Sequence, residues 1–166
     1  MKATRRQISS TDFVLRLLPS YKIETARQKL ESLGTVEPVT GHSCLYLVHL
    51  AKAAASPRKG WQRIRQALGG NVEVTPVFLE PDQSPKFAAG TLQVRFPTPP
   101  TDAELQEWLP SGLRLKSRNQ YVPSQVALEP DDPTEHYLPD LLAALEKQSD
   151  QDIKIWPETL QQFRRG

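Results

Sequence analysis

Hydrophobic and polar residues in the second half of the chain follow two spacings in turn. Leu92, Val94 and Phe96 alternate with polar residues, which is typical of a half-buried strand. A later stripe has the three- and four-residue steps of a helix: Leu138, Leu141, Leu142 and Leu145. Across residues 91–157 these spacings predict the order strand, helix, strand, strand, helix, strand. A capping box at Thr101–Glu104 is expected to start the first helix.

The first half of the chain follows the same order of elements, as expected for an internal repeat. Four positions in the first half align with four in the second at one constant shift of 79 residues: Arg16 with Arg95, Leu30 with Leu109, Val36 with Leu115 and Leu47 with Val126. We therefore predict an α+β fold of two tandem ferredoxin-like βαββαβ units. Each unit would have an antiparallel four-stranded sheet with two helices on one face.

The boundaries of the two units follow from local composition. We expect the first unit at 12–79 and the second at 91–157. A polar, proline-rich stretch at 80–90 is predicted to link them. Residues 1–11 are predicted to be a flexible N-terminus, and residues 158–166 a C-terminal tail.

Composition narrows the class of protein. The 166 residues carry a net charge of +2 and contain no apolar run near the roughly 20 residues that cross a bilayer. The small net charge gives no strong attraction to nucleic acid or anionic lipid. The single cysteine, Cys44, excludes an internal disulfide or a multi-cysteine metal site. Because Cys44 begins a strand-like run, we expect a buried, inert thiol.

Strand alternation predicts which side chains lie on the sheet faces away from the helices. In the second unit this face is polar and basic and includes Gln93, Arg95, Gln125, Ala127, Lys154 and Trp156, with Arg114 and Lys116 beside them. In the first unit the corresponding face is more apolar and includes Val14, Leu18, Tyr46 and Val48. A contiguous apolar patch usually has a partner. The apolar face is expected either to pack against the other unit or to bind another protein.

Four stretches of the second unit carry a resemblance to a known family: Gly90–Phe96, Asp102–Leu109, the hairpin Gly112–Leu128 and Ile153–Pro157. In order and pattern they resemble the propeptide domain of subtilisin-like serine proteases, particularly the longer bacterial type. The closing strand is similar to the family's closing pattern, in which two hydrophobic residues separated by two others are followed, after one further residue, by proline. The first unit matches the same outline more weakly, best at Asn71–Pro76.

The resemblance implies a non-catalytic protein that assists the folding of a subtilisin-like protease and then inhibits it, in cis or in trans. The open sheet face of the second unit would dock on the protease. The tail would enter the active-site cleft like a product: Glu158, Thr159, Leu160, Gln161, Gln162 and Phe163. It implies no cofactor or metal. A cytoplasmic protein is expected because no signal sequence is present, or a secreted one if the chain is a trimmed prodomain.

Two other classes of function are less favoured. Sheets of this topology bind single-stranded RNA through aromatic side chains on the central strands, but those positions here hold Gln93, Arg95, Gln125 and Ala127. An RNA-binding or protein-interaction adaptor is therefore the alternative. Catalysis is disfavoured because the three histidines lack metal-ligand spacing and no phosphate loop or nucleophile elbow is present. Asp131 and Asp132 are interpreted as a turn.

Overall fold

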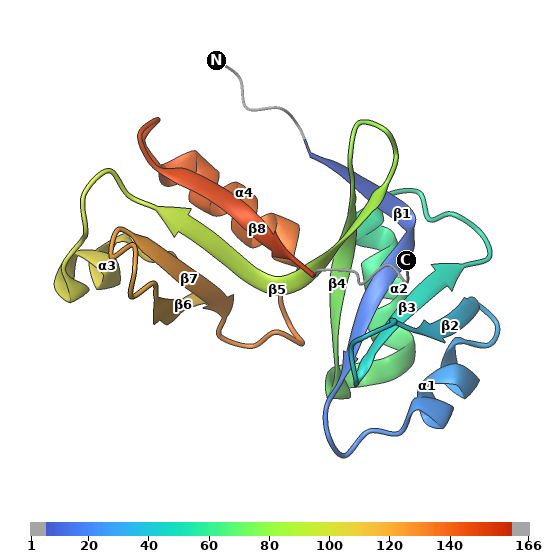
Figure 1. Ribbon diagram of the computed structural model, residues 1–166. Coiled ribbons are helices and arrows are strands. Elements are labelled where there is room, and N and C mark those ends of the chain that lie inside the picture. Colours follow the sequence, from blue (N-terminus) through green and yellow to red (C-terminus); the bar gives the residue numbers. More distant parts are fainter. Residues whose placement is uncertain (1–5, 161–166) are drawn as a thin grey trace. The chain divides into compact units, whose positions relative to one another are not determined.

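The computed structural model describes residues 6–160, which contain eight β-strands and four α-helices (Figure 1). The chain divides into two compact units. Among the described residues, unit 1 comprises 6–88 with 159 and 160, and unit 2 comprises 89–158. Each unit has the element order strand, helix, strand, strand, helix, strand. The α+β class and the antiparallel strands predicted from the sequence are confirmed.

Unit 1 is a sheet with two helices packed on it. Its elements are β1 (Gln7–Leu17), α1 (Ile23–Leu30), β2 (Gly34–Pro38), β3 (Leu45–Leu50), α2 (Pro57–Leu68), a 3₁₀ turn (Gly69–Asn71) and β4 (Val72–Leu79). The strands are hydrogen-bonded in the order β2-β3-β1-β4. Helix α2 packs on β1 and β4, and α1 packs on α2 and β2.

Unit 2 has the same order of elements. They are β5 (Pro85–Arg95), α3 (Asp102–Trp108), β6 (Leu113–Arg118), β7 (Gln125–Pro130), α4 (Leu138–Gln148) and β8 (Lys154–Thr159). Strand β7 pairs with both β6 and β5, and β5 lies between β7 and β8 (Figure 1). The first residues of β5 belong to unit 1, where they pair with the end of β4.

Two local predictions for unit 2 are confirmed. Thr101 and Glu104 form the complete capping box at the start of α3. All four leucines of the predicted α4 stripe are buried. They face a layer of equally buried strand residues: Leu92, Val94, Val126 and Leu128. The helix-facing side of the sheet is therefore the core of this unit.

Three sequence predictions differ from the structure. The predicted linker at 80–90 is a tight turn followed by the first half of β5, since Pro85 already pairs with Leu79. Residues 7–11, predicted to be flexible, belong to β1. The residue pattern at 122–129 also predicts a strand, but the observed strand begins only at Gln125. The preceding residues form a turn in which Gln125 N donates to Val122 O.

The prediction of a buried Cys44 thiol is wrong. Cys44 is exposed and lies before β3 with φ of 63°, in the left-handed region. The hydrophobic run from Leu45 onward forms the strand, as predicted. Cys44, which was expected to begin this strand, is instead the last residue of the preceding turn, because its left-handed φ lies outside the β region.

Gly60 is required by close packing of α2 on β1. A Cβ atom at this position would lie 2.5 Å from the Phe13 ring. Gly60→Ala is expected to lower the free energy of unfolding by about 1–3 kcal/mol, despite the higher helix propensity of alanine, because the core must shift. Chemical denaturation measures the change. Gly70→Ala, which meets no atom within 4 Å, is the control. Equal effects of the two substitutions would contradict this packing.

None of the helices in residues 6–160 is long and apolar enough to cross a membrane.

Candidate binding face

Register places most of the predicted surface of unit 2 on one sheet face. Gln93 pairs with Ala127, and Arg95 pairs with Gln125. Directly paired residues in an antiparallel sheet lie on the same face, so these four side chains are together on the face opposite the core. We call this surface, with Lys154 and Trp156 of β8, the open face.

The open face is crossed by a chain of side-chain hydrogen bonds. The Arg95 guanidinium donates to Gln125 Oε1 at 2.8 Å, and Gln125 Nε2 donates to Gln93 Oε1 at 3.1 Å. Gln93 Nε2 then donates to Glu158 Oε2 at 3.3 Å. Glu158 Oε2 also accepts from the Thr91 hydroxyl. Each polar group therefore restricts the rotamer of its neighbour across three strands.

Trp156 adds an aromatic ring to the open face. The Arg95 guanidinium carbon lies 5.9 Å from the ring centroid, within the range of a cation–π contact. Arg95 therefore joins the β7 and β8 sides of the face. Lys154, two residues before Trp156 on the same strand, lines a neighbouring hollow together with Arg95. The face thus carries fixed positive charge beside a half-buried indole.

Sequence reasoning missed two members of this network. Thr91 continues the alternation of Gln93 and Arg95 toward the start of β5. The period-two pattern could therefore have predicted that Thr91 lies on the open face. Glu158 was assigned to the tail, but it lies in β8 and holds Thr91 and Gln93. Arg114 also pairs with Glu129 across β6 and β7 at 2.9 Å.

The apolar face predicted for unit 1 is corrected by the register. Val48 pairs with Phe13 and Tyr46 with Leu15, so Tyr46 and Val48 lie on the helix-covered face. Val14 lies on the opposite face, where it pairs with Leu47. Tyr46 and Val48 were therefore assigned to the wrong face. The prediction was one residue out of register in this strand, and an error of one residue assigns every side chain to the opposite face of the sheet.

The apolar surface around Val14 is covered within unit 1. Its buried residues form one cluster: Val14, Val39, Leu45, Val77 and Phe87. Leu47 and Leu160 pack against this cluster. Leu18, the remaining predicted member, follows the end of β1 and is 39% exposed.

The structure describes the first half of the predicted tail. Glu158 and Thr159 belong to β8. The Leu160 backbone N–H donates to Phe87 O at 2.8 Å, while its side chain packs on the apolar cluster. Insertion of Leu160 into an enzyme cleft would require these contacts to be broken. Gln161, Gln162 and Phe163 lie outside the described residues.

Asp132 lies in the loop between β7 and α4. Asp132 Oδ1 accepts from the Thr134 backbone N–H and hydroxyl, consistent with the predicted turn. Among residues 6–160, no three His, Cys, Asp or Glu side chains lie close enough to hold a metal ion. His49 contacts Asp12 at 2.5 Å on the exposed surface of unit 1.

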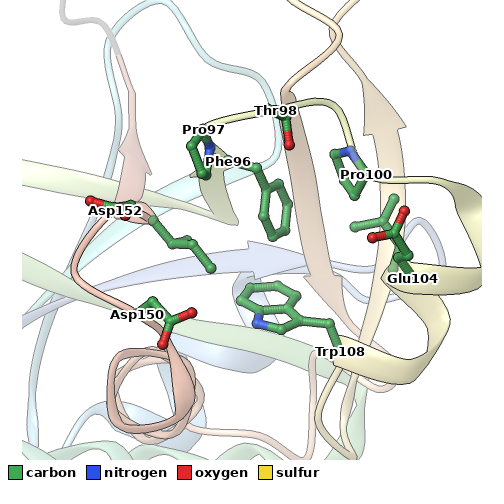
Figure 2. Close-up of a pocket in the computed structure, with 10 residues that line it drawn as sticks. Phe96, Pro97, Thr98, Pro100, Glu104, Trp108, Asp150 and Asp152 are labelled. Carbon is green, nitrogen blue, oxygen red and sulfur yellow. The ribbon is translucent and has the colours of Figure 1, made fainter.

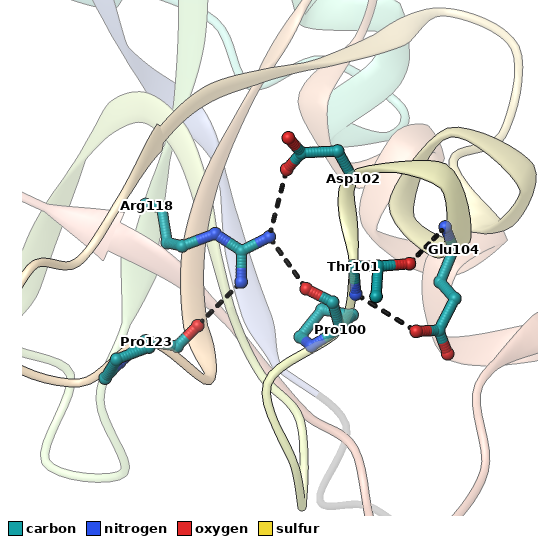
Figure 3. A network of polar contacts seen from close by, with 6 residues as sticks. All are labelled: Pro100, Thr101, Asp102, Glu104, Arg118 and Pro123. Atoms are coloured by element: carbon teal, nitrogen blue, oxygen red, sulfur yellow. Dashed lines mark hydrogen bonds and ion pairs between the residues drawn. The ribbon is translucent and has the colours of Figure 1, made fainter.

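The capping box gives unit 2 a predicted acid sensitivity. Hydrogen bonds from the Thr101 backbone and side chain lower the pKa of Glu104 below its usual 4.5 (Figure 3). The folded state therefore gains stability from ionised Glu104 above about pH 4.5, and loses it as the pH falls through the lowered value. Thr101→Ala should remove about 1 kcal/mol at neutral pH and reduce this acid dependence.

Denaturation at several pH values tests the capping prediction. Thr101→Ser retains the hydroxyl acceptor and is the matched control. The capping assignment fails if Thr101→Ala and Thr101→Ser have the same stability at neutral pH.

Comparison of the sequence with protein-family models and with curated proteins found no match.

Proposed function

We propose that this chain is a tandem of two ferredoxin-like units and acts as a non-catalytic, propeptide-like binding protein for a subtilisin-like serine protease. The strand orders β2-β3-β1-β4 and β6-β7-β5-β8 support the fold assignment, because each is the order of a ferredoxin-like sheet. The open face of unit 2 is the proposed docking surface for the protease. The C-terminal residues that follow β8 are the proposed inhibitory segment.

The observation that carries this proposal is the hydrogen-bonded network across the open face. Flexible Gln and Arg side chains normally lose rotamer freedom when a partner binds. Here Gln93, Arg95 and Gln125 already restrain one another before binding. Ala127 places a small side chain at the centre of the face. Trp156 provides an aromatic contact of the kind enriched at interface hot spots.

The charges of the open face favour an acidic partner surface. Arg95 and Lys154 are exposed cations, while Glu158 is held by Thr91 and Gln93. Complementary charge raises the association rate more than the affinity, and dissolved salt screens this electrostatic attraction. Association with the protease should therefore slow as the salt concentration rises.

Inhibition of a broad-specificity bacterial subtilisin tests the proposal. The purified chain is titrated against the enzyme while hydrolysis of a chromogenic peptide is followed. We expect saturable inhibition that declines as the chain is slowly cleaved. Absence of both transient and lasting inhibition would overturn the proposal.

A shortened chain separates docking from active-site blockage. Removing residues 161–166 leaves β8 and the Leu160 contacts in place. The shortened chain should still bind catalytically inactive subtilisin, but should inhibit the active enzyme less than the full chain. Equal inhibition by both chains would place the inhibitory contact elsewhere.

Single-stranded RNA is the alternative occupant of the open face. A base that stacked on Trp156 would have to displace Arg95 from the ring, which favours a protein partner. Salt-sensitive retention on single-stranded RNA, without inhibition of subtilisin, would support the alternative instead.

A further inference from the structure

A hollow of about 280 Å³ lies in unit 2 where β5 ends and α3 begins (Figure 2). Phe96 and Trp108 point into it, and their rings meet edge to face with centroids 5.0 Å apart and an interplanar angle of 75°. Phe96 N donates to Ser124 O at 2.8 Å, and Gln148 Nε2 donates to Trp108 O at 2.5 Å. Both aromatic residues are thus fixed through their backbones by other elements.

Three carboxylates surround the two rings. Glu104 comes from α3, and Asp150 and Asp152 come from the turn before β8. None of the described residues that line the hollow is basic. The capping box fixes Glu104 and lowers its pKa, so this carboxylate is ionised at neutral pH. Aromatic faces and carboxylates together favour an organic cation.

Nearby cations leave one side of the hollow free for such a ligand. Arg95 and Lys154 line the neighbouring hollow, which shares Asp152. Repulsion from them disfavours a cation beside Asp152. Glu104, Asp150 and the Trp108 ring are absent from that second lining and define the favourable side.

Arg118 holds the loop that forms the rim. Its guanidinium donates to Pro100 O and Pro123 O, each at 2.9 Å, and lies 3.4 Å from Asp102 (Figure 3). These contacts join the proline-rich loop before α3 to the turn before β7. The rim is therefore shaped before any ligand binds, which lowers the cost of binding.

We propose that this hollow binds the arginine side chain of a peptide. A guanidinium is flat, stacks on aromatic rings and presents several donors to carboxylates at once. A lysine ammonium is more strongly hydrated and fits this combination less well. The site uses no residue of the open face, so it is independent of the proposed protease binding.

The indole N–H signals of the three tryptophans provide the readout. N-acetyl-arginine methylamide is added to the ¹⁵N-labelled full chain over a range around the millimolar affinity expected for one side chain. Trp108 should shift saturably. Trp61 is the internal control, because it is buried in unit 1 with its Nε1 bonded to Val74 O. Trp156 reports binding at the open face.

Two related probes distinguish charge from shape. The citrulline analogue keeps the shape of arginine without its charge and should bind at least about tenfold more weakly. The lysine analogue should bind about threefold more weakly than the arginine probe. Equal response to arginine and citrulline, or no saturable Trp108 shift with arginine, would overturn the proposal.

Substitutions in the hollow complete the test. Replacing both Glu104 and Asp150 by their amides, as Glu104→Gln with Asp150→Asn, should weaken arginine binding about tenfold, and glutamine at 104 can still serve the capping box. Glu107→Gln neutralises one carboxylate on α3 outside the lining and should leave binding unchanged. Unchanged affinity in the double variant, with its fold intact by NMR, would also overturn the proposal.

Discussion

Replacing Ala127 by glutamate is expected to weaken inhibition of subtilisin about 100-fold while leaving unit 2 folded. Ala127 pairs with Gln93 at the centre of the open face, where its small side chain is 8% exposed and points away from the helices. A glutamate side chain there would project toward the partner and lose its hydration on docking. The resulting loss is that of a strong interface hot spot.

The matched control makes the same chemical change away from the open face. Ala144 is exposed on α4, where glutamate is a favourable helix residue. Ala144→Glu should inhibit within about threefold of the unsubstituted chain, as expected for a residue outside the interface. Inhibition constants and melting temperatures are measured for both variants. Undiminished inhibition by a folded Ala127→Glu chain would mean that the open face does not dock on the protease.

Replacing the next residue along β7 should have the opposite effect. Leu128 is fully buried and pairs with Leu92 and Leu115 on the core face. Leu128→Ala should lower the free energy of unfolding by about 3 kcal/mol, from lost apolar burial and the cavity left behind. Urea denaturation measures this loss. The folded fraction should still inhibit, because the open face is unchanged.

Leu18 offers a control for the leucine-to-alanine change. It is 39% exposed, so Leu18→Ala should cost well under the Leu128→Ala value, at most about 1 kcal/mol. If Ala127→Glu instead unfolds unit 2 and Leu128→Ala leaves stability unchanged, the register of β7 is displaced by one residue. The adjacent substitutions therefore test the face assignment directly.

The open face could be predicted closely from sequence on the β5 side, because residues 92–95 alternate between buried and more exposed side chains. Gln93 and Arg95 are separated by Val94, which is fully buried. In β7, Ala127 is itself only 8% exposed between buried Val126 and Leu128, so its face follows from its pairing with Gln93. A strand with one buried face repeats every two residues, so pattern alone assigns each side. The hydrogen bonds between the side chains depend on which strands are neighbours, and alternation does not contain that information.

The face assignment of Tyr46 and Val48 in unit 1 was wrong because unit 2 contains one additional residue between the aligned strands. The constant shift of 79 aligned Tyr46 with Gln125, but the observed pairs Arg16–Leu45 and Arg95–Gln125 make Leu45 the counterpart of Gln125. The irregularity in β6 between Leu115 and Ser117 accounts for the extra residue, since β2 pairs with β3 without one. A bulge adds one residue to one strand and reverses every later face assignment made by a constant shift.

The sequence by itself determined the order of elements, the capping box at Thr101 and the buried stripe of α4. These features depend on spacing and on contacts between near neighbours in the chain. Tertiary structure decided the place of Leu160 on the apolar cluster and the meeting of Phe96 with Trp108 beside Asp150. Such contacts join residues far apart in sequence, so they follow from strand pairing and helix packing and leave no periodic signal in the chain.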